Sequence, residues 1–308
     1  MDRRVFLQSS LAAGSIALGT GAAGAASSHS TTSARAGEKF KLKYAPHHGM
    51  FRHHAGGDYL DQLRFAAEQG FHAWEDNGMM GRPVELQEQA GELMRELGIT
   101  MGVFVADAEF RRPNYARGGA ERRQELQTKM ERAVECAKRV GAKWCTVVPG
   151  RFDSRLEWDY QTANVIDCLK AMCEVAEPAG LVMVLEPLNP FTDHPGQFLT
   201  KVPQAYLICK AVGSPSCKIL DDLYHQQITE GNLIPNLDRA WEEIAYIQVG
   251  DNPGRKEPTT GEIHYQNIFR YLAGRNFEGV IGMEHGLSRG GKEGEQALID
   301  AYRWCDDF

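Results

Sequence analysis

Short apolar runs alternate with longer amphipathic stretches along the chain from Phe40 onward. The apolar runs predict strands at residues 41–46, 71–75, 99–106, 143–148, 181–186, 218–222, 246–249 and 280–284. Helical spacing of apolar positions predicts helices at 59–69, 84–97, 120–140, 160–179, 202–212, 236–244, 265–273 and 292–304. Such alternation is typical of parallel strands joined by crossover helices.

The number of strand–helix units limits the possible folds. Eight units fit an α/β protein of the (β/α)8 type, the TIM barrel, whose usual size is about 250 residues. An open doubly wound sheet is the alternative, but its Gly-x-Gly-x-x-Gly fingerprint does not follow the first predicted strand. We therefore expect a single-domain TIM barrel over residues 39–308.

Polar side chains stand at the ends of the last four predicted strands. Glu186, Asp222 and Glu284 end three of these strands, and Gln248 lies near the end of the fourth. The active site of a TIM barrel is built where its strands end, so these side chains should lie close together. Asp221 is the alternative to Asp222, because alternation along a strand turns only one of the two into the barrel mouth.

The composition of this cluster predicts a metal site. Three carboxylates in one place repel each other unless a cation lies among them. Carboxylate and amide oxygens are hard ligands, which suit Mn²⁺, Mg²⁺ or Ca²⁺ better than zinc or copper. We therefore predict one divalent ion, Mn²⁺ or Mg²⁺ by preference, with the ligands Glu186, Asp222, Gln248 and Glu284.

Two other polar features flank the predicted site. Four histidines follow the first strand, and they form either a polar loop lining the pocket or a second metal site: His47, His48, His53 and His54. Glu75 ends the second strand, where it is placed to orient a substrate hydroxyl or to pair with a nearby arginine.

Three sequence motifs resemble the hydroxypyruvate isomerase family. They are LEPLN at residues 185–189, DLYHQQ at 222–227 and, most specifically, the polar loop QVGDNPGRKEPTTGEIHY at 248–265. The family is a branch of the xylose-isomerase-like barrels, which also contain the ketose 3-epimerases. The resemblance covers nearly the whole chain after its N-terminal leader.

The resemblance implies a role for each site residue. It places the metal ligands at the same four positions and the acid/base pair at Glu186 and Glu284, and it assigns substrate binding to His225, Arg255 and Glu262. The epimerase branch usually carries histidine where this chain has Gln248, which favours the isomerase branch. The segment Glu284-His285-Gly286 replaces the family's usual Glu-Tyr-Lys-Pro beside the pocket, so the substrate stays open.

The implied activity is that of a metal-dependent intramolecular oxidoreductase. It interconverts a small hydroxy-aldehyde and hydroxy-ketone, of the hydroxypyruvate and tartronate semialdehyde type, through a cis-enediolate. The alternatives are a ketose 3-epimerase and a metal-dependent lyase or hydrolase acting on an oxidised sugar or glycoside. A sugar-binding module without turnover is disfavoured by the intact pair of glutamates.

Charge and cysteine content limit the partners. Forty-one acidic against 34 basic residues give the 308-residue chain a net charge of −7, and no sustained basic run is present. Nucleic acids and anionic membranes need a positive surface, so we expect a small-molecule hydroxy-carbonyl or sugar substrate instead. The composition is compatible with a homo-oligomer. Seven scattered cysteines form no C-x-x-C pair and are expected to be small core residues.

The N-terminus has the layout of a secretory signal. Arg3 and Arg4 are followed by a weakly apolar run at 11–18 and by small residues at 19–28. The apolar run is too short for a membrane span. We expect a twin-arginine signal peptide at residues 1–26 and a flexible leader at 27–38, with export to the periplasm or otherwise out of the cytoplasm. No membrane association is expected after cleavage.

We expect the double substitution Arg3→Lys and Arg4→Lys to keep the precursor in the cytoplasm. The protein should still fold there, because the predicted signal contributes nothing to the barrel. Cell fractionation followed by immunoblotting measures the distribution of precursor and mature protein. Unchanged export of the double variant would contradict the twin-arginine assignment.

Overall fold

The computed structural model describes residues 37–308, and the predicted signal peptide lies outside them. Seven parallel strands form one curved sheet in the order β1 (Lys43–Ala45), β9 (Val280–Gly282), β8 (Ile244–Gln248), β7 (Cys217–Asp222), β6 (Val182–Leu185), β5 (Trp144–Val148) and β4 (Val105–Ala108). A second parallel pair consists of β2 (Ala73–Trp74) and β3 (Thr100–Met101).

The second pair closes the curved sheet into a barrel. A parallel bridge joins His47 to Glu75, next to β1 and β2. On the other side, the amide of Asp76 donates to Val103 O at 3.2 Å, and the amide of Thr146 donates to Phe104 O at 2.8 Å. The predicted single-domain TIM barrel is therefore confirmed.

The third predicted strand, residues 99–106, is not continuous, which corrects the prediction. Its first part pairs with β2 and its last part with β5, so the chain changes neighbours at residues 102–104. Gly102 lies at this point, where its amide donates to Trp74 O at 2.7 Å. A Cβ atom there would lie 2.3 Å from the hydroxyl oxygen of Tyr246, so only glycine fits without displacement.

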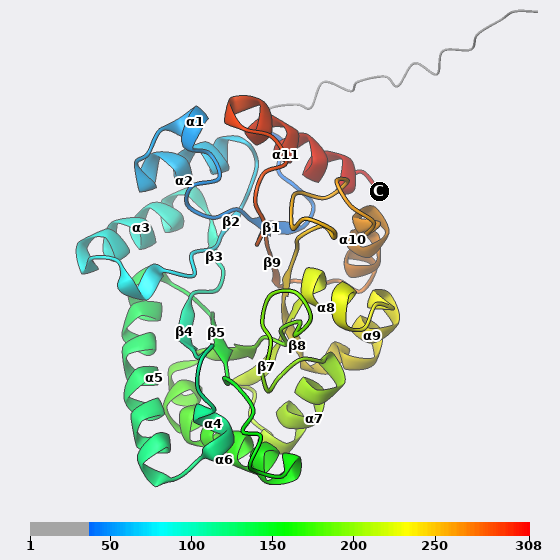
Figure 1. The fold of residues 1–308 in the computed structure, drawn as a ribbon. Helices are drawn as coiled ribbons and strands as arrows, with labels where there is room; N and C mark the ends of the chain where they lie inside the picture. The colour runs from blue at the N-terminus through cyan, green and yellow to red at the C-terminus, as the bar shows by residue number, and fades with distance from the viewer. Residues whose placement is uncertain (1–36) are drawn as a thin grey trace, which may run out of the picture. The chain divides into compact units, whose positions relative to one another are not determined.

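Helices form an outer ring around the strands (Figure 1). The long ones are α2 (Tyr59–Glu68), α3 (Val84–Leu97), α5 (Ala120–Val140), α6 (Trp158–Ala176), α7 (Val202–Val212), α9 (Leu233–Ala240), α10 (Tyr265–Gly274) and α11 (Gly291–Cys305). The predicted helices 160–179 and 236–244 end in short 3₁₀ turns. Three short helices escaped prediction: α1 (Arg52–Ala55), α4 (Asn114–Arg117) and α8 (Leu223–Thr229).

The interior of the barrel is filled by side chains rather than open. One buried apolar cluster takes a residue from nearly every strand: Ala45, Ala73, Val103, Trp144, Val184, Leu220, Tyr246 and Val280. A larger cluster of buried apolar residues lies between the strands and the helices, and it includes all seven cysteines. All seven cysteines are buried and unpaired, as expected. Within residues 37–308, no helix combines the length and the apolar character needed to cross a membrane.

We expect Gly91→Ala to destabilise the barrel by about 1–3 kcal/mol, the usual cost of overpacking. A Cβ at Gly91, in α3, would lie 2.2 Å from the backbone oxygen of Arg139 in α5, so the two helices must separate. Gly274→Ala is the matched control, because nothing lies within 4 Å of its Cβ position. Urea denaturation followed by circular dichroism compares the two. Equal midpoints would contradict close contact between these helices.

Candidate active site

Four of the predicted site residues lie at the carboxyl ends of neighbouring strands. Glu186 directly follows β6, Asp222 is the last residue of β7 and Gln248 is the last residue of β8, while Glu284 stands two residues after β9. These strands are hydrogen-bonded in parallel, so their ends share one edge of the barrel. The mouth of the barrel at this edge is the candidate active site.

His225 joins two of these carboxylates from the short helix α8. Its Nε2 lies 3.8 Å from Glu186 Oε1 and 3.6 Å from Asp222 Oδ2. The potential ligand atoms of these three residues lie within 4.8 Å of one another, and they form a potential metal site. Asp222, not Asp221, is therefore the residue of this pair that faces the site. Asp221 is buried elsewhere, and one of its oxygens has no hydrogen-bond partner among the described residues.

Arg255 brings positive charge to the same place. Its Nη2 lies 3.0 Å from Asp222 Oδ2 and 3.3 Å from Glu284 Oε2. Its Nε also donates to the backbone oxygen of Glu284 at 3.1 Å. One guanidinium therefore links the ends of β7 and β9 and offsets part of the carboxylate charge.

Burial shifts the protonation of the groups in the site. Removal from water, strengthened by the neighbouring charges of Glu284 and Asp222, raises the pKa of Glu186 well above its usual value. Burial likewise raises the pKa of Glu284 to about 7, although Arg255 opposes the shift. Burial lowers the pKa of His225 to about 4, so its imidazole is neutral at pH 7. The pKa values of two carboxyl groups in the site, Glu186 and Glu284, are thus raised above the usual range of a glutamate.

The residues present fit a divalent cation. Gln248 Oε1 is buried and has no hydrogen-bond partner among the described residues, although such orphaned acceptors are costly. Gln248 ends β8, which lies between β7 and β9, so it stands at the same edge of the barrel as Glu186, Asp222 and Glu284. An amide oxygen beside three carboxylates is the donor set that hard divalent ions prefer.

The hydrogen bonds of Asn189 determine which nitrogen of His225 carries its proton. Asn189 Oδ1 accepts from the amides of Thr192 at 2.9 Å and Asp193 at 3.3 Å. Its Nδ2 must then be the atom that lies 2.7 Å from His225 Nδ1. Because Nδ2 is a donor, Nδ1 accepts, and the proton of the neutral ring is assigned to Nε2. His225 therefore presents a donor N–H, rather than a lone pair, toward the two carboxylates, and in this tautomer its Nε2 is not a metal ligand although it lies within the potential metal site.

Asp251 holds the loop that carries Arg255. Its buried carboxylate accepts hydrogen bonds from the amides of Asn252 at 3.0 Å, Gly261 at 2.8 Å and Ile263 at 3.1 Å. Its backbone oxygen accepts from the amide of Arg255 at 2.8 Å. The sequence analysis did not single out this role, although an aspartate directly after a strand and a glycine is a common loop organiser.

Glu262 lies apart from the buried cluster. It is exposed, and its Oε1 accepts from Asn252 Nδ2 at 2.8 Å and from Gln227 Nε2 at 3.1 Å. These hydrogen bonds, that of Asn252 first, lower the pKa of its carboxyl. Its assignment to substrate binding stays a prediction.

The histidines after β1 divide into two structural roles. His47 and His48 line a cavity of about 270 Å³ beside Glu75, Asp76, Arg82 and Glu284. His54 instead pairs with the buried carboxylate of Glu295 in α11, at 2.6 Å from Nδ1 to Oε2. Within residues 37–308, the four histidines take part in no metal-ligand group. The ion pair of Arg82 with Asp76 beside this cavity was missed, because neither residue stands in a recognised motif.

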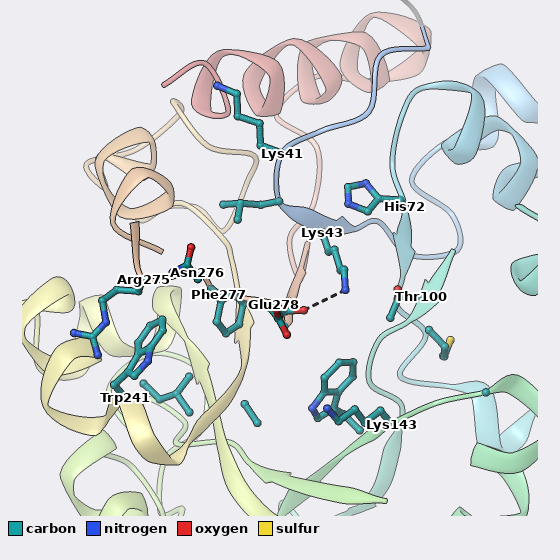
Figure 2. Close-up of a pocket in the computed structure, with 17 residues that line it drawn as sticks. Lys41, Lys43, His72, Thr100, Lys143, Trp241, Arg275, Asn276, Phe277 and Glu278 are labelled. Carbon is teal, nitrogen blue, oxygen red and sulfur yellow. Dashed lines mark hydrogen bonds between the residues drawn. The ribbon is translucent and has the colours of Figure 1, made fainter. Parts of the chain in front are cut away.

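A larger cavity, of about 930 Å³, opens where the strands begin (Figure 2). Lys41, Lys43 and Lys143 line it together with Trp144 and a single carboxylate, Glu278. Its cations already have partners: Lys43 donates to Glu278 O at 3.2 Å, and Lys143 Nζ lies 5.1 Å from the ring centre of Trp144. With no second carboxylate, this cavity lacks an acid/base pair.

Comparison with known proteins places this geometry in a family. The profile described as "Xylose isomerase-like TIM barrel" matches residues 63–308. The chain belongs to the xylose isomerase-like TIM barrel family.

Two relatives within this family are isomerases. The 2-oxo-tetronate isomerase of Cupriavidus necator is 31% identical over 243 residues, which are 77% of this chain and 89% of the relative. The hydroxypyruvate isomerase of Escherichia coli is 29% identical over 187 residues, 61% of this chain and 69% of the relative. The crystal structure of 3-keto-D-glucoside 4-epimerase from E. coli superposes with a TM-score of 0.69 at 23% identity, covering 86% of this chain and 99% of that one. This chain is therefore similar to isomerases over most of its length and to an epimerase in its fold.

We expect nitrogen-15 NMR of histidine-labelled protein at pH 7 to show His225 neutral with its proton on Nε2. Asn189→Leu removes the donor at Nδ1 and should produce a mixture of the two tautomers. Turnover should fall by about 10²-fold if the N–H stabilises negative charge on a substrate oxygen. His225→Asn identifies the signal by deleting it. A proton on Nδ1 in the parent protein would contradict the assignment.

Proposed function

We propose that this protein is a metal-dependent isomerase of a small hydroxy-aldehyde and hydroxy-ketone pair. Glu186 and Glu284 would act as its acid/base pair through a cis-enediolate. The observation that carries the proposal is the position of these two glutamates around one site with Asp222, His225 and Arg255. The raised pKa values of both glutamates support it further.

The two glutamates have the properties that proton transfer between adjacent carbons requires. A general base works best when its pKa lies near the working pH. One carboxylate removes the proton from the carbon that bears a hydroxyl group. The electron pair of that C–H bond forms the C=C bond of the enediolate, and the π pair of the carbonyl moves onto the carbonyl oxygen. The other carboxyl group gives a proton to the former carbonyl carbon, where the C=C π pair forms the new C–H bond, and the hydroxyl proton passes to the former carbonyl oxygen, so that carbonyl and hydroxyl exchange places.

Glu186, Asp222, Gln248 and Glu284 would hold the divalent ion, with Mn²⁺ or Mg²⁺ favoured by the oxygen ligands. When bound, this ion polarises the substrate carbonyl and acidifies the adjacent C–H bond. His225 donates from Nε2, and Arg255 donates from its guanidinium, to the oxygens that gain negative charge. Each such placed donor is worth about 3–4 kcal/mol in the transition state.

The names of the two relatives indicate the substrate class. Both act on short hydroxy-oxo acids, and we propose a substrate of the same kind, such as hydroxypyruvate or tartronate semialdehyde. The 4-epimerase structure supports a second candidate, in which the proton returns to the opposite face of the same carbon. Export through the twin-arginine pathway is part of the proposal and rests on the sequence of residues 1–26.

We expect Glu186→Gln and Glu284→Gln each to lower turnover by about 10²–10⁴-fold, the usual contribution of general acid–base catalysis. The amide keeps an oxygen for the metal but cannot accept the substrate proton, so metal content should fall much less. Turnover in D₂O by the parent protein should place solvent deuterium on the product carbon. Removal of metal with a chelator should abolish turnover, and added Mn²⁺ should restore it.

Glu278→Gln is the control, because Glu278 lines the cavity at the other end of the strands. It should turn over like the parent. Near-parental activity of either site variant would show that the two-glutamate mechanism is wrong. Mass and stereochemical analysis of the product separates the candidates: an isomerase moves the carbonyl, an epimerase inverts one centre, and a lyase or hydrolase releases a fragment.

A further inference from the structure

We propose that Glu75 is a positioning residue that turns the amide oxygen of Gln248 toward the metal ion. The inference rests on the proposed function, because it concerns the ion of that site. The sequence analysis left Glu75 with two roles, orienting a substrate hydroxyl or pairing with an arginine. The hydrogen bonds of its carboxylate point to a third.

Both oxygens of Glu75 are already used within the protein. The side chain directly follows β2 and is 1% exposed. Its Oε2 accepts from the hydroxyl of Tyr246 at 2.8 Å, and its Oε1 accepts from Gln248 Nε2 at 2.8 Å. The hydroxyl of Tyr246 itself accepts from the amide of Val103 at 3.3 Å, so its proton is directed to Glu75.

The contact with Glu75 selects one of the two orientations of the Gln248 amide. A carboxylate oxygen accepts hydrogen bonds, so the NH₂ group of Gln248 must face it. The oxygen of the amide then points the other way, where it is buried and has no hydrogen-bond partner among the described residues. Metal ions bind side-chain amides through oxygen, so this orientation makes Gln248 a ligand. The reverse orientation would present NH₂ groups, which repel a cation.

The absence of a side chain at Gly282 leaves room for the contact between Glu75 and Gln248. Gly282, the last residue of β9, pairs with Gln248 across the sheet. A Cβ at Gly282 would lie 1.9 Å from Glu75 Oε2 and 3.0 Å from Gln248 Cγ. The carboxylate and the amide therefore meet over a glycine, where any larger residue would separate them.

A purely structural role explains Glu75 less well. Glu75 is buried, and it lines one cavity together with Asp76 and Glu284. A buried acid beside other acids costs stability, and an apolar residue would fill the same space without that cost. Outer partners that orient metal ligands typically contribute 10–100-fold to metal affinity.

The test compares three forms of the protein by titrating chelated samples with Mn²⁺ in a calorimeter. We expect Glu75→Leu to weaken Mn²⁺ binding by about 10–100-fold, because the Gln248 amide is free to reverse. Glu75→Asp is the control for charge, since it keeps the carboxylate but shortens the side chain by one carbon and draws its oxygens away from Gln248 Nε2. It should also weaken Mn²⁺ binding, because the Gln248 amide is again free to reverse. Circular dichroism confirms that each variant is folded.

Three outcomes overturn the inference. Parental affinity in Glu75→Asp, beside a loss in Glu75→Leu, would show that Glu75 acts through its charge alone. Parental affinity in Glu75→Leu, with only a lower melting temperature, would show a structural role. If Glu75→Leu does not fold, Glu75→Met follows the path of the glutamate side chain and replaces it. Absence of Mn²⁺ binding by the parent would instead reject the proposed function, and this inference with it.

Discussion

Crowding of buried carboxylates is the constraint on which the rest of this structure depends. Glu75, Glu186, Asp222 and Glu284 stand around one end of the barrel. Within residues 37–308, Arg255 is the charged partner of two of them, because the nearby His225 is neutral at pH 7. Burying charges of one sign together costs several kcal/mol unless they are protonated or matched by opposite charge. The pKa values of Glu75, Glu186 and Glu284 are raised, which is the effect expected from this cost. A divalent cation removes the conflict, which is why the site is better explained by a metal than by hydrogen bonds alone.

The neutral side chains of the site, His225 and Gln248, are oriented by hydrogen-bond partners that lie outside it. Asn189 receives two backbone amides on its oxygen, and this leaves its NH₂ for His225. Glu75 receives the NH₂ of Gln248, which leaves the amide oxygen for the site. A neutral imidazole has one donor and one acceptor nitrogen, and an amide has one donor and one acceptor end. A hydrogen-bond partner on one side therefore determines which of the two is presented to the site. These outer partners lie on different loops, so the barrel rather than any single motif determines the orientations.

The sequence predicted the barrel and the strand ends well, because both follow from local patterns. Runs of buried apolar residues ended in Glu186, Asp222 and Gln248, and the structure has strands ending within one residue of each. The break at Gly102 depends on a contact with Tyr246, 144 positions away along the chain, so no local pattern could show it. The same limit applies to Asn189 and His225, whose contact requires α8, a helix too short to produce apolar periodicity.

The loop after β8 shows how a strong motif can still mislead about individual residues. Its polar side chains stand in one run, yet Arg255 reaches the carboxylates, Asp251 turns inward to bind backbone amides, and Glu262 is exposed. The three directions follow from the geometry of the loop. Asp251 accepts hydrogen bonds from backbone amides that have no partner in a strand, and in the loop held this way Arg255 has a left-handed φ of 51°. The guanidinium then extends over the ring of Tyr224, 4.8 Å from its centre, toward Asp222. The position of Arg255, the cation that pairs with this cluster in the described part of the chain, therefore depends on an aspartate whose carboxylate binds backbone amides of the loop.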